Sequence, residues 1–173
     1  MKRKPITDGA KSADTWEQIS QMYDRLVYWL YERQDADRAR SYADRLEKTL
    51  ARNETEAGAI FAEECRSLIY EARGDGKQAI KHREKEIALI RRLHARARNT
   101  LNERYVFRQY SYADLRDRLE VLAMLYREQG DVDKAVATLQ RAKHFCKKHR
   151  VSFTAEAILQ EYQEDKQISH HGK

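Results

Sequence analysis

Apolar residues recur along most of the chain at the three- and four-residue spacing of an amphipathic helix. Two stripes show this pattern: Tyr23, Leu26, Val27 and Leu30, and later Leu119, Leu122, Ala123 and Tyr126. No stretch alternates between apolar and polar residues as a half-buried strand does. The pattern therefore predicts an all-α fold.

Polar turns and capping residues divide this pattern into separate helices. Asp, Asn and Ser side chains accept hydrogen bonds from the first backbone N–H groups of a helix, so they mark helix starts. The candidate caps are Asp35 or Asp37, Asn53 with Glu56, Asp75, Ser111 with Asp114, Asp131 and Ser152. We expect seven helices, over residues 14–33, 36–51, 55–73, 76–100, 111–129, 131–149 and 153–165. The short breaks between them predict antiparallel neighbours.

Three of the predicted turns are followed, four or five positions on, by an alanine. They are Gln34-Asp35 with Ala39, Gly74-Asp75 with Ala79, and Gly130-Asp131 with Ala135. Around the third turn the chain reads Leu122, Ala123, Tyr126, Gly130, Asp131, Ala135, Leu139 and Ala142, a pattern that resembles the tetratricopeptide repeat. The resemblance implies three helical hairpins and a last amphipathic helix that caps the stack.

The pattern departs from the family in its spacing. The alanines after the turns are 40 and 56 residues apart, whereas the family repeats every ~34 residues. Divergent repeats are the first interpretation, and a compact helical bundle is the alternative. The domain would span residues 14–166, between a flexible basic segment at 1–13 and a flexible tail at 167–173.

Composition agrees with a helical protein that stays in water. The 173 residues are 36% charged and include one proline and six glycines, so little interrupts a helix. The N-terminal stretch has no apolar core of a signal peptide, and no apolar run approaches the ~18 residues of a membrane span. We expect a cytoplasmic protein whose two cysteines, Cys65 and Cys146, are reduced and buried.

Motifs for catalysis, cofactors or metals are missing from the sequence. It contains no phosphate-binding glycine loop, GxSxG, HExxH or CxxC pattern. His144 and Cys146 lie on different sides of the predicted helix, so they cannot share a metal with His149. We therefore expect no enzyme activity, no cofactor and no metal.

Positive charge is concentrated in one segment. Residues 77–108 carry ten Lys or Arg against three Asp or Glu. Five of these side chains follow helical spacing along one face: Lys77, Lys81, Lys85, Arg92 and Arg96. Four aromatic residues come next, Tyr105, Phe107, Tyr110 and Tyr112. Cations beside aromatic rings are typical of nucleic-acid binding, which is the alternative function; a solvated helix face is the simpler explanation.

The family resemblance points to a different surface, because the first helix of each tetratricopeptide hairpin lines a concave groove that holds a peptide. Carried over from each turn, the groove positions are Gln21, Asp24, Tyr28, Tyr31, Glu32, Phe61, Glu64, Leu68, Glu71, Ala72, Asp117, Glu120, Met124, Arg127 and Glu128. Seven of these are acidic and one is basic. Such a groove suits a basic or amphipathic segment, although pairing with neighbouring arginines would also explain the acids.

The predicted function is therefore a non-enzymatic protein–protein interaction module, an adaptor or regulator that binds a partner segment in an acidic groove. Nucleic-acid binding through the basic segment is the second hypothesis. Self-association, with the basic stripe of one copy in the acidic groove of another, is the third.

Overall fold

The computed structural model describes residues 8–51, 58–97 and 110–171, and the chain divides into two compact units. Unit 1 comprises residues 1–79 and unit 2 comprises residues 80–173. The described ranges contain seven α-helices, one π-helical turn and no strand. This confirms the predicted all-α fold of about seven helices.

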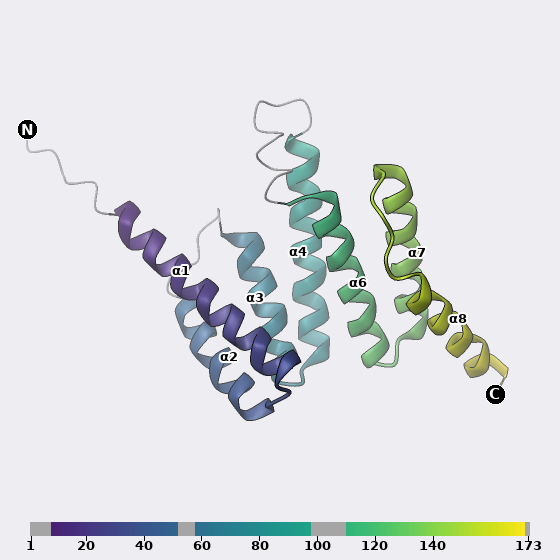
Figure 1. The fold of residues 1–173 in the computed structure, drawn as a ribbon, viewed down its shortest axis with the longest axis horizontal. Helices are drawn as coiled ribbons and strands as arrows, with labels where there is room; N and C mark the ends of the chain where they lie inside the picture. The colour runs from purple at the N-terminus through teal and green to yellow at the C-terminus, as the bar shows by residue number, and fades with distance from the viewer. Residues whose placement is uncertain (1–7, 52–57, 98–109, 172–173) are drawn as a thin grey trace, which may run out of the picture. The chain divides into compact units, whose positions relative to one another are not determined.

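Unit 1 is built from α1 (Asp8–Val27), the π-helical turn η1 (Tyr28–Glu32), α2 (Ala36–Ala51), α3 (Ala59–Ala72) and the first turn of α4 (Gly76–Ala97). Helix α2 packs against both α1 and α3 (Figure 1). Ala39 and Ala43 of α2 are fully buried, as are Leu26 and Leu46. Small residues at this position let the helix axes approach closely, and the larger side chains fill the space beside them.

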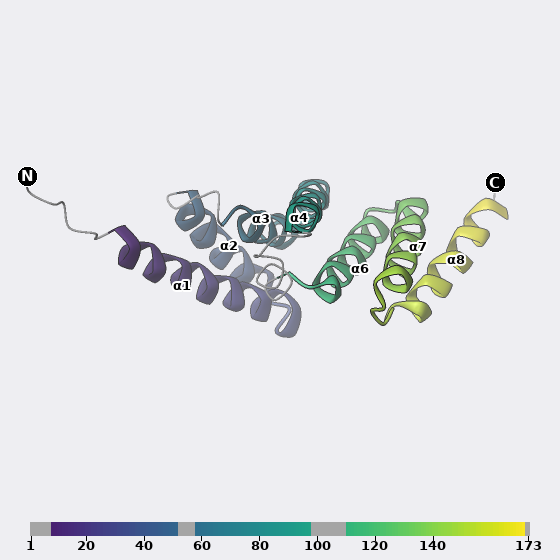
Figure 2. The ribbon, with the colours of Figure 1, turned by 90° about the horizontal axis from the view of Figure 1, so that it is seen from above.

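Unit 2 contains the rest of α4, followed by α6 (Tyr112–Glu128), α7 (Val132–His149) and α8 (Glu156–His171). Helix α7 packs against α6 on one side and α8 on the other (Figure 2). The predicted small residues Ala123, Ala135 and Ala142 are all fully buried, and Tyr126 is 7% exposed beside them. The apolar residues of the repeat-like pattern therefore belong to the core of this unit.

The turns after Arg73 and Gln129 have one geometry. Gly74 and Gly130 have φ angles of 76° and 79°, a conformation that only glycine adopts without strain. The N–H of the next residue reaches back five positions, from Asp75 to the Tyr70 carbonyl and from Asp131 to the Tyr126 carbonyl, both at 2.9 Å. This is a Schellman motif. Asp75 and Asp131 also cap the helices that follow them. Each aspartate therefore completes the end of one helix with its N–H and begins the next helix with its carboxylate.

The first turn, between η1 and α2, contains one additional residue. Asp35 N–H donates to the carbonyl of Trp29, six residues back rather than five. The π-helical turn η1 accommodates the extra residue, as such turns commonly do. Gln34 takes the position of the glycine, with a φ of 51°. Asp35 caps α2 through the N–H of Arg38 at 3.0 Å, so it is the cap and Asp37 is not.

The helix ends at the two termini differ from the prediction. Helix α1 begins at Asp8, inside the segment expected to be flexible, and α8 ends at His171, inside the expected tail. Ser152 was wrongly predicted to cap α8. Residues 151–155 are not helical, and the first helical bond of α8 runs from Leu159 N–H to the Ala155 carbonyl. The predicted Asn53 cap with Glu56 lies outside the described residues.

Candidate functional site

The predicted groove residues of unit 1 meet where α1 and η1 run beside α3. Tyr23 donates to Glu64 at 2.9 Å, and Tyr31 donates to Glu71 in the last turn of α3. Phe61 packs on the Tyr23 ring at a centroid distance of 5.4 Å. Since Tyr23 and Tyr31 contact successively later residues of α3, the two helices run parallel.

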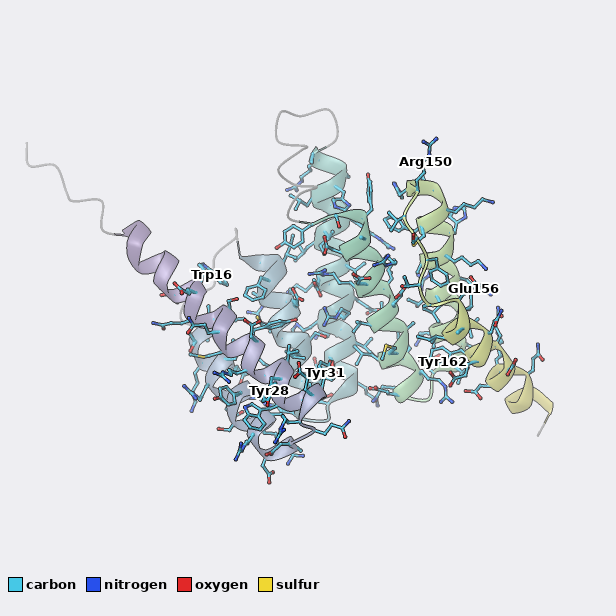
Figure 3. All side chains as sticks on the ribbon, in the orientation of Figure 1. Trp16, Tyr28, Tyr31, Arg150, Glu156 and Tyr162 are labelled. Atoms are coloured by element: carbon cyan, nitrogen blue, oxygen red, sulfur yellow. The ribbon has the colours of Figure 1, made fainter. Side chains whose placement is uncertain are left out.

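This acidic face of unit 1 is partly open to solvent. Asp24 and Glu32 are exposed, and Tyr31 is 49% exposed (Figure 3). Tyr28 is half-buried, with its ring edge-on to Trp29 at 5.1 Å.

Two of the other predicted positions do not belong to this open surface. Leu68 and Ala72 were assigned to the groove, but both side chains are buried in the apolar core of unit 1. Gln21 is exposed and donates to Glu17 on its own helix.

The predicted groove residues of unit 2 form a stripe along α6. Asp117 and Glu128 are exposed, and Met124 between them is 46% exposed. Glu120 accepts hydrogen bonds from the Thr154 hydroxyl, with both carboxylate oxygens at 3.0 Å. Met124 is therefore an exposed apolar side chain with carboxylates before and after it on the same helix. We call these four residues the α6 stripe.

Helix α8 extends the acidic surface beyond the α6 stripe. Arg127 donates through Nε to Asp165 of α8 at 3.1 Å, and its guanidinium lies over the Tyr162 ring. Burial raises the pKa of Tyr162, and the negative charges of Glu161, Glu128 and Asp165 raise it further. The sequence analysis did not assign the α8 carboxylates to the groove, because α8 follows no repeat-like turn. The acidic residues of α8 are nevertheless recognisable in the sequence.

The predicted groove residues divide between the two units. Those from Gln21 to Ala72 belong to unit 1 and those from Asp117 to Glu128 belong to unit 2. The exposed members of each set form an acidic face within their own unit.

The predicted basic stripe lies on α4. Its five members are all exposed: Lys77, Lys81, Lys85, Arg92 and Arg96. Two of the four aromatic residues predicted beside it are described, and both Tyr110 and Tyr112 are half-buried. The Tyr112 ring lies 5.1 Å from that of His94 and 4.0 Å from that of His149, so two rings already lie against it. Tyr105 and Phe107 lie outside the described residues.

A buried ion cluster fixes α4 against α6. Glu86 is fully buried and Arg83 is 5% exposed, and the two are paired at 2.5 Å. Arg118 of α6 donates to the second oxygen of Glu86. These charges are enclosed by the fold, so we assign them to the packing of unit 2 and not to a ligand site.

The described ranges contain no group of three or more His, Cys, Asp or Glu side chains placed to hold a metal ion. None of their helices is long and apolar enough to cross a membrane. No protein-family model matches the chain, and comparisons with curated proteins and with solved structures found no similar one.

Proposed function

We propose that this chain is a non-enzymatic interaction protein of divergent tetratricopeptide-like hairpins, which acts in the cytoplasm and holds a basic amphipathic segment of a partner protein. Two features support the repeat assignment: the shared turn geometry at Gly74 and Gly130, and the buried alanines that follow each turn. Both are properties of paired antiparallel helices that stack side by side.

The observation that carries the binding proposal is the α6 stripe. Met124 is one of two large apolar side chains that are exposed within the described ranges, and carboxylates stand before and after it on the same helix. An apolar anchor supplies affinity, while surrounding charge supplies orientation and association rate. The complementary partner is a helix with an apolar ridge and flanking Lys or Arg.

The acidic face of unit 1 also combines one exposed apolar side chain with nearby carboxylates. Tyr31 is the other exposed apolar side chain, and Asp24 and Glu32 lie on the same helical rod. Because Glu64 and Glu71 already accept hydrogen bonds from tyrosines, their charge is held in place without further rearrangement. Binding to rigid helices of this kind needs little conformational change.

Methionine methyl NMR tests the proposal directly, because the chain has only three methionines. Met22 is half-buried in unit 1 and Met124 is exposed in unit 2, so one is an internal control for the other. The probe is an 18-residue helical peptide of leucine and lysine with one apolar face. We expect it to shift the Met124 methyl signal, whereas a scrambled peptide of equal charge should not.

Two variants sharpen the test. Glu128→Lys should weaken the peptide by about tenfold or more through loss of complementary charge. Met124→Ser should weaken it by a similar factor through loss of the anchor. Asp37→Lys on α2 is the matched control, because its side chain is 98% exposed and the charge change is the same. Equal weakening in all three, or equal affinity for the scrambled peptide, would overturn the proposal.

A further inference from the structure

The two ends of α6 show how α4 and α7 lie relative to each other within unit 2. Near its C-terminal end, Tyr126 donates to Glu84 of α4, while Lys134 of α7 lies over the same ring at 5.4 Å. Near its N-terminal end, the Tyr112 ring contacts His94 of α4 and Phe145 of α7, at 5.1 and 5.7 Å. Both helices therefore flank one side of α6 and run parallel to each other.

The register of these contacts places two arginines together at the middle. Glu84 of α4 lies at the level of Lys134 of α7, and His94 lies at the level of Phe145. Residues at the same level of the two helices are therefore about 50 positions apart in the sequence. By this offset, Arg91 of α4 lies at the level of Arg141 of α7. Arg91 is exposed but partly covered by its neighbours, which lowers its pKa, and the positive charge of Arg141 lowers the pKa further. Like charges so placed repel each other unless an anion lies beside them.

The basic stripe predicted on α4 is therefore one part of a wider surface. We call it the basic face and define it by seven exposed side chains of unit 2: Lys81, Arg91, Arg92, Arg96, Arg141, Lys147 and Lys148. Arg141 donates only to Ala137 and Thr138 oxygens of its own helix among the contacts of the described ranges. The two exposed acids of these helices have other contacts, since Glu84 accepts from Tyr126 and Asp133 pairs with Lys166 at 2.7 Å.

We propose that the basic face of unit 2 binds the phosphate backbone of double-stranded DNA. Phosphate contact needs only correctly placed Lys and Arg side chains, and this face supplies them on two parallel helices. DNA binding by the basic face goes beyond the proposed binding of a basic segment, because it uses positive side chains of α4 and α7 and not the acidic α6 stripe.

The composition of the face separates this partner from three others. A membrane-bound helix inserts large apolar side chains, and a protein interface is built around aromatic or apolar anchors. Among the described residues the large apolar side chains that are exposed are Tyr31 and Met124, neither of which lies on α4 or α7. Recognition of single-stranded RNA and DNA relies on stacking against exposed aromatic rings, but the Tyr112 ring is half-buried against the rings of His94 and His149.

Three double variants test both the partner and the contribution of α7. Arg92→Glu with Arg96→Glu reverses two charges on α4, and Lys147→Glu with Lys148→Glu reverses two on α7. The matched control reverses Arg25 and Lys48, which are exposed in unit 1. Each pair lowers the net charge by four, so a difference between them reports position and not total charge.

Anisotropy of a labelled 25-base-pair DNA duplex gives the readout, measured with the full chain over a salt series. We expect the α4 and α7 variants each to bind at least tenfold more weakly than the control. Each should also reduce the slope of log K against log salt by about 1.8, the value for two lost phosphate contacts.

Far-UV circular dichroism shows whether the variants remain helical. If a charge reversal unfolds unit 2, the double variant Arg91→Gln with Arg141→Gln removes two positive charges without introducing negative ones. Three outcomes would overturn the proposal: no binding of the duplex at low salt, an α7 variant that behaves like the control, or stronger binding to single strands, duplex RNA or anionic lipid vesicles. The peptide experiment above uses different residues, so either result can fail alone.

Discussion

Gln34 occupies a backbone position that the other two hairpin turns give to glycine. Its φ of 51° places it in the left-handed region, where the Cβ atom of an L-residue meets the following carbonyl oxygen. At Gly74 and Gly130 there is no such atom, and no heavy atom lies within 4 Å of the place where it would be. The cost of a side chain at these turns is therefore a backbone cost and not a steric clash with neighbours.

Substitutions that introduce or remove glycine should both be informative: introducing glycine at Gln34 should raise stability, and removing glycine at Gly130 should lower it. Gln34→Gly should stabilise unit 1 by about 0.5 kcal/mol, because relief of ~1 kcal/mol of strain exceeds the added entropy of the unfolded chain. Gly130→Ala should destabilise unit 2 by about 1 kcal/mol. Urea denaturation measures both. Destabilisation by Gln34→Gly would show that its side chain makes a compensating contact.

The helices themselves were predictable wherever their limits are local. The Ser111–Asp114 capping box is present as the sequence suggested: Ser111 N–H donates to the Asp114 carboxylate at 2.7 Å, and Asp114 N–H donates to the Ser111 hydroxyl at 3.1 Å. Asp75 and Asp131 cap the helices after their turns for the same reason. Each of these contacts joins residues three positions apart, so spacing alone is enough to find it.

Features that depend on distant packing were not predictable in this way. The π-helical turn η1 and the burial of Leu68 follow from how α1 and α3 lie against α2. The placement of α4 beside α7 depends on Tyr126, which the repeat pattern marks only as an apolar position, and on Tyr112, which the sequence shows only as an aromatic residue after the basic stripe. The spacing on α4 groups five side chains that are exposed, but it could not identify the second helix beside them.

The capping box of α6 should make stability depend on pH. Burial alone would raise the pKa of Asp114, but hydrogen bonds from Ser111 and the charge of Arg118 hold it below its ordinary value of 3.8. A carboxyl with a lowered pKa in the folded state stabilises the fold above its unfolded pKa and loses this contribution as pH falls through the folded value.

Asp114→Asn should therefore cost about 1 kcal/mol at pH 7. The difference from the unsubstituted chain should shrink as the pH falls below about 5, and it should be lost once the pH has passed the lowered pKa of Asp114. Denaturation followed by circular dichroism at each pH measures this. Asp117→Asn is the control, since this acid lies on the same helix outside the cap. A penalty that stays constant over the range would contradict the assignment.

At the scale of the whole molecule, the division into two units has a spectroscopic consequence. Both tryptophans, Trp16 and Trp29, belong to unit 1, whereas helices of both units contribute to circular dichroism. Fluorescence therefore follows one unit, and circular dichroism follows both.

A core truncation in each unit uses this difference. Leu46→Ala in unit 1 and Leu139→Ala in unit 2 remove equivalent, buried side chains, each at a cost of about 2–5 kcal/mol. We expect Leu46→Ala to lower the fluorescence midpoint, and Leu139→Ala to lower the circular-dichroism midpoint while the fluorescence midpoint stays near its original value. Equal shifts in both signals for Leu139→Ala would show that the shared helix α4 couples the units into one cooperative transition.

The two cysteines extend this division to chemistry. Cys65 is enclosed in the core of unit 1 and Cys146 in the core of unit 2, each at 1% exposure or less. Burial also raises the pKa of the Cys146 thiol, so little reactive thiolate is available in the folded state. A thiol reagent can then modify each site only when its surroundings open. Peptide mapping of the modified chain would time the opening of each half separately, with reporters that the sequence already contains.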